Sequence, residues 1–163
     1  MKHESVSMTL ECVYDDYAAY AMAKQMGKKE DEAYFAKRAN YYKNLFDKRI
    51  GFMRPRKSDG KWLDPFNPSA MGGAKDGGMD YTEGNAWQYT WHVQHDVPGL
   101  IKLFGGKKKF FNKLDSLFTV PLVSTVSDVS GLIGQYAHGN EPSHHVVYFY
   151  TMAGRPERTA ELV

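Results

Sequence analysis

The chain has 163 residues, a length that suits one domain with a hydrophobic core of its own. Its hydrophobic content of 42 %, charged content of 25 % and net charge of +2 are ordinary for a globular protein, so they indicate no nucleic-acid partner. No run of about 18 apolar residues occurs, so no membrane-spanning helix is predicted. The single cysteine excludes an internal disulfide.

The first third of the chain is predicted to form a helical hairpin. Residues 5–26 show helical spacing, and Ser5 or Ser7 can cap the first turn. A second helix is expected over about 30–46, antiparallel to the first because few residues separate the two. The apolar stripe of the first helix is expected to contain Leu10, Val13, Tyr14, Tyr17, Ala21 and Met22. Cys12 falls in this pattern, so we expect a buried structural thiol.

Residues 50–81 differ in character from the helical segments. They contain three prolines, and six glycines lie from Gly51 through Gly78. The Asp59-Gly60 pair predicts a short β-hairpin turn, and the rest is expected to be a long ordered loop or an exposed flap.

Helices are predicted again in the second half of the chain, and three helix ends share one pattern. The expected helices span residues 85–93, 96–104, 109–118 and 143–152, a connection spans 119–135, and a last helix begins at Pro156. Glycine followed by a basic residue closes three predicted helices, at Gly27-Lys28, Gly105-Gly106-Lys107 and Gly154-Arg155. This repetition predicts stacked αα-hairpins, as in a toroid or a solenoid. The run Lys107-Lys108-Lys109 is interpreted as a solvated helix start.

A first candidate site lies in the segment Tyr81-Thr82-Glu83-Gly84-Asn85-Ala86-Trp87-Gln88-Tyr89. Aromatic neighbours are expected to desolvate Glu83 partly, which would raise the pKa of its carboxyl group and suit it to donate a proton to a glycosidic oxygen. The alternative interpretation is structural, because an acidic residue in a first helical turn is favoured by the helix dipole.

A second candidate site lies in the segment His138-Gly139-Asn140-Glu141-Pro142-Ser143-His144-His145. Asn and Glu oxygens suit a hard cation such as calcium. Zinc bound through the histidines is conceivable, but no HExxH-type spacing is present. Two carboxylates in aromatic, amide-rich surroundings are the working parts of glycoside hydrolysis.

Taken together, these motifs resemble glycoside hydrolase family 92, the calcium-dependent exo-acting α-mannosidases. The resemblance runs through nearly the whole chain and includes Ser7-Met8-Thr9-Leu10-Glu11, Tyr14-Asp15-Asp16, Asn44-Leu45-Phe46-Asp47, Gly51-Phe52-Met53-Arg54-Pro55-Arg56, the segment 81–89, His95-Asp96-Val97 and the segment 131–145. Each motif is short, but their ordered set is highly specific.

The resemblance implies an all-α fold in which αα-hairpins form part of an (α/α)6 toroid, together with removal of terminal α-linked mannose, expected to be α-1,2-linked, with inversion. It implies that Glu83 is the general acid. Asn140 and Glu141 are expected to bind calcium, which would hold sugar hydroxyls. Substrate-binding residues are expected at Trp87, Gln88, Glu141, His144 and His145.

The resemblance also implies parts that this chain does not contain. The chain is expected to be a partial toroid over residues 1–163, truncated at both ends, without an N-terminal β-sandwich domain and without a later segment that carries the aspartate general base. Inversion needs that base to activate water on the far face of the sugar, so the chain alone is expected to be inactive. Exposed faces of an incomplete toroid predict self-association. The parent enzyme is expected to be periplasmic, at the cell surface or secreted.

Two alternatives from other classes remain. A non-catalytic carbohydrate-binding or helical scaffolding module would explain the aromatic residues without chemistry. A helical repeat that binds another protein would explain the hairpins, but it gives no reason for Asn140-Glu141-Pro142 followed by His144-His145.

Overall fold

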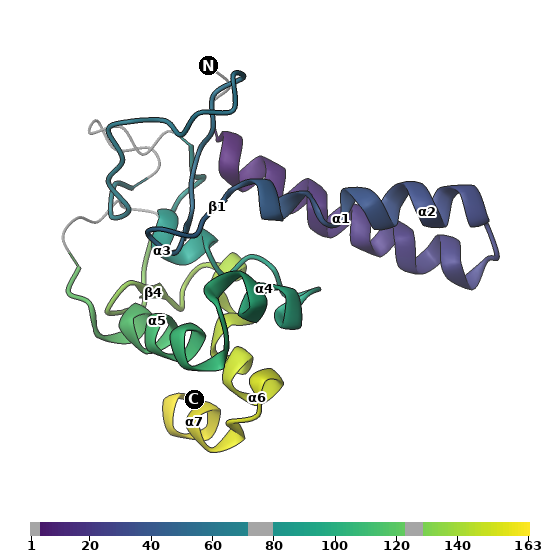
Figure 1. The fold of residues 1–163 in the computed structure, drawn as a ribbon. Coiled ribbons are helices and arrows are strands. Elements are labelled where there is room, and N and C mark those ends of the chain that lie inside the picture. The colour runs from purple at the N-terminus through teal and green to yellow at the C-terminus, as the bar shows by residue number, and fades with distance from the viewer. Residues whose placement is uncertain (1–3, 72–79, 123–128) are drawn as a thin grey trace.

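The computed structural model describes residues 4–71, 80–122 and 129–163, and it is mainly helical (Figure 1). The α-helices are α1 Ser5–Gln25, α2 Lys29–Arg38, α3 Ala86–Tyr89, α4 Val97–Phe104, α5 Lys107–Thr119, α6 Phe149–Ala153 and α7 Pro156–Leu162. The strands form two short antiparallel pairs, β1 Phe46–Asp47 with β2 Phe52–Met53, and β3 Leu132–Ile133 with β4 Tyr136–Ala137. The all-α fold class is therefore confirmed. Parts of the predicted loop and of the predicted connection, at 72–79 and 123–128, lie outside the described residues.

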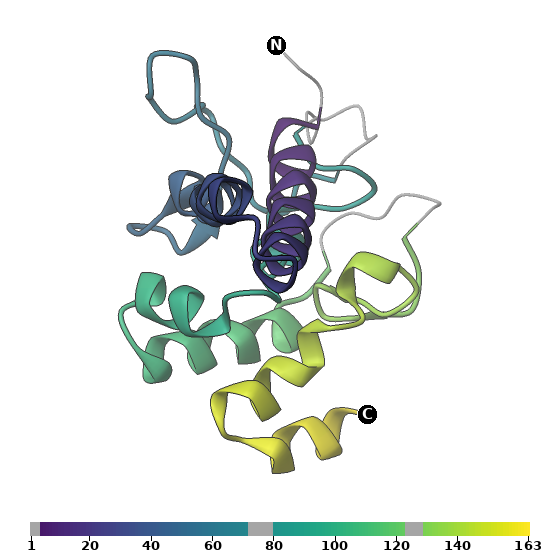
Figure 2. The ribbon, with the colours of Figure 1, turned by 90° about the vertical axis from the view of Figure 1, so that its right-hand side faces the viewer.

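Three helical hairpins form the frame of the molecule, as the glycine pattern predicts. Figure 1 shows α1 and α2 side by side and antiparallel, extending away from the other helices, and Figure 2 shows the α4–α5 and α6–α7 hairpins below them. The glycines between the paired helices have the left-handed backbone that a helix end favours, with φ of 67° at Gly27, 84° at Gly105 and 97° at Gly154. Within the described residues, no helix is both long and apolar enough to cross a bilayer.

The first hairpin departs from the predicted details in its caps and its buried face. Neither Ser5 nor Ser7 caps α1, because Glu4 occupies the cap position and no side chain bonds there. Tyr14, Tyr17 and Met22 of the expected apolar stripe are exposed. The buried residues of α1 are Val6, Ser7, Leu10, Val13, Asp16 and Ala23. The buried line of α1 is narrower than the sequence pattern indicates, and among the described residues its main contacts are with α2, the turn Tyr41–Asn44 and α3.

Three predicted helices are shorter than expected. Helix α2 ends at Arg38, and the chain forms a 3-10 turn at Tyr41–Asn44 before strand β1 pairs with β2. Helix α3 is a single turn, and the predicted helix 143–152 consists of two 3-10 turns followed by α6. The β3–β4 pair was not predicted. In the first case the pairing of β1 with β2 overrides the helical spacing of the side chains.

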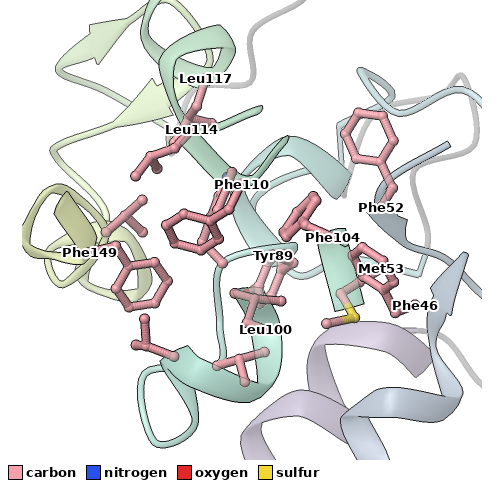
Figure 3. Close-up of a cluster of buried hydrophobic side chains, with 14 of the residues drawn as sticks. Phe46, Phe52, Met53, Tyr89, Leu100, Phe104, Phe110, Leu114, Leu117 and Phe149 are labelled. Atoms are coloured by element: carbon pink, nitrogen blue, oxygen red, sulfur yellow. The ribbon is translucent and has the colours of Figure 1, made fainter. Parts of the chain in front are cut away.

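The hydrophobic core lies where the β1–β2 pair, α3 to α5 and α6 meet (Figure 3). Trp91 is fully buried there; its ring stacks on Phe104 and meets Phe110 edge-on, with ring centroids 5.5 Å apart in both pairs. Burial of an aromatic side chain of this size contributes about 2–3 kcal/mol. This core fixes the 85–93 segment, which follows the turn that carries Glu83.

The turn at Asp59-Gly60 also forms as predicted, closed by a bridge between Arg56 and Trp62.

Candidate active site

Glu83 lies on a tight turn that its neighbours hold in a strained conformation. Its φ of 43° is in the left-handed region, which costs a non-glycine residue about 1 kcal/mol or more and persists only where the surroundings fix it. On the N-terminal side, the Thr82 N–H donates to Ser7 Oγ at 3.1 Å. The Tyr89 hydroxyl donates to the Thr82 carbonyl at 2.9 Å. The turn therefore presents the Glu83 side chain from a fixed backbone.

The residues after Glu83 fix the start of α3 and occupy the amide of Gln88. Asn85 and Gln88 form a capping box, in which the Gln88 N–H donates to Asn85 Oδ1 and the Asn85 N–H donates to Gln88 Oε1. The buried side chain of Gln135 continues this network, since Asn85 Nδ2 donates to its Oε1 at 3.0 Å and Gln88 Nε2 donates to its backbone carbonyl at 3.1 Å. Gln88 thus positions the turn through both of its amide atoms.

The structure brings the two predicted motifs into direct contact. Asn140 Nδ2 donates to the Glu83 backbone carbonyl at 2.9 Å, across 57 residues of sequence. Glu141, next in the chain, begins the 3-10 turn Glu141–Ser143 and is exposed. Because the Asn140 amide nitrogen is engaged, its side-chain oxygen is the atom that could serve a ligand. The predicted acid and the predicted metal-binding pair therefore belong to one site.

Two neighbouring cavities lie around Glu83. The larger, which we call the acidic cavity, has a volume of about 350 Å³ and is lined by Glu4, Met8, Glu11, Cys12, Thr82, Glu83, Tyr89, Asn140, Glu141 and Pro142. The smaller, which we call the small cavity, has a volume of about 10 Å³ and is lined by Glu83, Gln88, Tyr89, His92, Asn140, Pro142 and Ser143. Glu83 and Asn140 line both cavities.

The charged residues that the structure describes along the wall of the acidic cavity are glutamates. Four glutamates line it, and within 4–71, 80–122 and 129–163 no lysine or arginine is among its lining residues. Glu11 lies 3.2 Å from His92, between Oε2 and Nε2, and this interaction holds the pKa of the Glu11 carboxyl below its ordinary value. Burial raises the pKa of Tyr89 to about 12, so its hydroxyl stays neutral and can donate. The cavity suits a neutral polyhydroxyl ligand or a cation better than an anion.

Glu83 itself differs from the prediction in its surroundings. Its side chain is exposed in this chain, and the predicted desolvation by Trp87 is wrong. The Trp87 ring points to another part of the molecule, where it meets Phe52 edge-on at 4.8 Å between centroids and lies 4.1 Å from Lys113 Nζ. Its indole N–H donates to Ser69 Oγ. Trp87 lines neither cavity, and its expected sugar contact stays a prediction.

The two histidines after Glu141 also lie outside both cavities. His144 is exposed and its Nε2 is 2.8 Å from the His138 carbonyl. His145 is partly buried, its Nε2 is 2.8 Å from the Trp91 carbonyl, and burial lowers its pKa to about 4. His145 is therefore neutral at physiological pH. Their expected roles toward a substrate stay predictions, and the structure shows both making backbone contacts.

Three residues of the site were not singled out from the sequence. Glu11, Cys12 and His92 line the cavities, although they come from α1 and from the end of the α3 segment. Cys12 is exposed, so the predicted buried thiol is wrong. Glu11 belongs to one of the motifs that carry the family resemblance and Cys12 was expected in the apolar stripe, but only the packing of α1 against the Glu83 turn places both at the acidic cavity. Among the described residues, no three His, Cys, Asp or Glu side chains form a cluster that could hold a metal ion.

Helical hairpins here bring several carboxylates together at one acidic cavity, and paired carboxylates are what glycoside hydrolysis requires. Residues 1–163 match the model of the glycosyl hydrolase family 92 catalytic domain over their whole length, and the chain belongs to this family.

Solved structures support this assignment. A family GH92 α-mannosidase from Bacteroides thetaiotaomicron, in complex with mannoimidazole, is 44 % identical with a TM-score of 0.92, and the match covers 99 % of this chain and 22 % of that chain. A family GH92 inverting mannosidase from the same organism is 32 % identical with a TM-score of 0.82, again over 99 % and 22 %. The hairpins are thus a fragment of an (α/α)6 domain, as the resemblance implied.

A curated relative agrees in class. An uncharacterised secreted glycosidase from Arthroderma benhamiae is 31 % identical over 174 residues, which cover 96 % of this chain and 21 % of that protein. The chain therefore spans about a fifth of the length of the relatives that it matches.

Proposed function

We propose that this chain forms one wall of the active site of an α-mannosidase that removes terminal α-linked mannose from glycans with inversion. The observation that carries the proposal is the hydrogen bond from Asn140 to the Glu83 carbonyl, which joins the two motifs at the acidic cavity. The related mannosidases, one of them an inverting enzyme, support the reaction class. A preference for α-1,2 linkages stays a prediction.

In this proposal Glu83 is the general acid. Its strained turn sets the carboxyl group at the mouth of the acidic cavity, where it can protonate the oxygen that leaves with the departing alcohol. An exposed carboxyl group can be desolvated when the substrate and further segments of the enzyme cover it. The base that activates water lies, by the family resemblance, in a later segment, so we expect no turnover by these 163 residues alone.

Calcium is proposed as the bound metal, held in part by Asn140 and Glu141. The donor chemistry fits, since both residues offer oxygen atoms at a cavity that four glutamates line. Two residues do not complete a shell of six to eight oxygens, so the remaining ligands would be water, sugar hydroxyls or other segments. Bound calcium would supply a fixed positive charge that orders two hydroxyl groups of the sugar.

A Glu83→Gln change in the complete polypeptide tests the role of Glu83. We expect kcat/KM on unactivated mannosides to fall by about 10²–10⁴, because protonation of a poor leaving group is lost. An aryl mannoside with an acidic phenol as leaving group should be affected far less. The matched control is Glu30→Gln, which changes an exposed glutamate on α2. Equal activity of Glu83→Gln and wild type on unactivated mannosides would refute the assignment.

Calorimetric titration tests the metal proposal. Calcium is titrated into the chelator-treated protein with and without mannoimidazole, a ligand bound by a related mannosidase. We expect calcium to strengthen inhibitor binding, and Asn140→Ala to weaken this coupling. Binding of inhibitor that is independent of calcium would refute the metal role. Binding without any turnover by the complete polypeptide would favour a carbohydrate-binding module instead.

A further inference from the structure

Glu11 and His92 form a pair that the proposed mechanism does not use, and it bridges the two cavities. Glu11 projects from α1 into the acidic cavity, while His92 follows α3 and lines the small cavity. Their side chains approach to 3.2 Å between Oε2 and Nε2. The carboxylate is 49 % exposed and the imidazole only 6 %. One partner is therefore open to a ligand and the other is held inside the protein.

The buried member of the pair has no structural explanation of its own. His92 Nε2 lies 3.2 Å from the Glu11 carboxylate without good hydrogen-bond geometry, and Nδ1 has no partner among the described residues, although the residue is only 5 % exposed. A buried polar atom without a partner costs about 1–3 kcal/mol. Tyr14, Tyr89 and His145 hold the ring, with centroids 6.4, 6.0 and 5.8 Å away. A fixed imidazole directed at a cavity indicates a role toward a ligand.

We propose that Glu11 is a specificity-determining residue that accepts hydrogen bonds from adjacent hydroxyl groups of the sugar, and that His92 is the positioning residue for its carboxylate. This inference rests on the proposed function, since it names a contact with the same sugar. An ionised carboxylate accepts hydrogen bonds and donates none, so it selects a ligand by the direction of its hydroxyls.

The surroundings of Glu11 favour this role over that of a surface ion pair. Among the described residues, neither lysine nor arginine lines the acidic cavity, so none of those that line it competes as a lysine or arginine cation for the free carboxylate oxygen. The interaction with His92 also favours the ionised form of Glu11, since it lowers the pKa of that carboxyl. The small cavity, at about 10 Å³, has room for one water molecule that could complete the hydrogen bonds of His92.

Steady-state kinetics of the complete polypeptide test the proposal with Glu11→Gln, His92→Phe, the double variant and Asp15→Asn. Asp15 is an exposed carboxylate one turn further along α1, so its variant is the matched control. For an aryl α-mannoside we expect Glu11→Gln to raise KM about 10- to 100-fold, the effect of losing one or two hydrogen bonds to a charged group, with kcat within about twofold. The control should match wild type.

The double variant separates positioning from folding. If His92 acts through Glu11, His92→Phe raises KM in wild type but adds nothing to Glu11→Gln. If His92 has only a structural role, the effects of the two substitutions on KM should add, and kcat should fall as well. Glu11→Asp, which keeps the charge on a shorter side chain, should recover part of the KM. Unchanged KM for Glu11→Gln would overturn the proposal.

Sugar binding by the same variants distinguishes this inference from the proposed function. Methyl α-mannoside, α-glucoside and α-galactoside are titrated by NMR into each protein. Turnover of mannosides with no effect of Glu11→Gln overturns only the role of Glu11. Absence of mannoside turnover, with binding of one glycoside that Glu11→Gln weakens, overturns only the proposed function. If the wild type neither hydrolyses nor binds any of the three, both are overturned.

Discussion

A Gln135→Leu change tests how the fold supports the site. Gln135 is fully buried, accepts a hydrogen bond from Asn85 Nδ2 at 3.0 Å, and donates one to the Pro121 carbonyl at 2.9 Å. Leucine has nearly the same volume but can make neither bond. The change therefore leaves the buried amide of Asn85 without this partner and removes a part-buried bond to the carbonyl of the exposed residue Pro121, while it creates no large cavity.

The expected cost is about 1–3 kcal/mol in the free energy of unfolding. The buried Asn85 amide that loses its partner costs about 1–3 kcal/mol, the lost bond to the Pro121 carbonyl adds about 0.5–1 kcal/mol, and the extra apolar surface of leucine offsets about 1 kcal/mol. Asn85 Nδ2 keeps a weak contact with Met71 Sδ at 3.2 Å, which lowers the total. For a chain of this length, the loss corresponds to a decrease in Tm of about 2–12 °C.

Urea denaturation followed by tryptophan fluorescence measures this change, because Trp91 is fully buried and reports on the core. Gln25→Leu, which makes the same replacement at an exposed position of α1, is the control and should shift the unfolding free energy by less than about 0.5 kcal/mol. A Gln135→Leu variant as stable as Gln25→Leu would show that the Asn85–Gln135 bond contributes nothing, and the reasoning about the buried amide network would fail.

Two further predictions concern stability. Folding lowers the pKa of His145 from about 6.5 to about 4, so between these pH values the unfolded chain binds more protons than the folded chain. The free energy of unfolding should therefore decrease by up to about 3 kcal/mol as the pH falls from 6.5 to 4. His145→Gln should flatten the pH profile of Tm while exposed His144→Gln should not, and equal slopes would contradict this. Gly134→Ala should lower the free energy of unfolding, measured by urea denaturation, more than Gly27→Ala does. Both glycines have positive φ, but an added Cβ at Gly134 would lie 2.6 Å from the Phe118 carbonyl carbon, whereas an added Cβ at Gly27 would meet no atom within 4 Å. Equal costs would show that the backbone at Phe118 gives way.

The sequence alone predicts the helical hairpins, because their signals are local. Glycine after a helical pattern is a local signal for a helix end, because it adopts the positive φ found there, and Gly27, Gly105 and Gly154 do so in the structure. Asp96 caps α4 by accepting a hydrogen bond from the Gly99 N–H, three residues away. The family resemblance also comes from local features, since it depends on short sequence motifs in a fixed order.

Helix lengths and buried faces depend on tertiary contacts and were less well predicted. Residues 41–47 have helical spacing, yet Phe46–Asp47 pairs with Phe52–Met53 because a strand pair there closes over the core and satisfies the backbone. Tyr14 and Tyr17 fit a helical apolar stripe, but the described part of the chain leaves them exposed. The hydrophobic pattern shows which residues can be buried; the packed neighbours decide which are.

The candidate site shows the same division. The sequence predicts that Glu83 lies directly before a helix that begins near Asn85 and that Asn140-Glu141 lies before another, and α3 does begin after the Asn85 cap, since a helix start is a local feature. Only the tertiary structure brings these segments together across 57 residues, turns Trp87 away from them, and adds Glu11 and His92 to their walls. The physical reason is that a capping box or a helix end depends on neighbours three or four residues away, whereas the walls of a cavity depend on how separate elements pack.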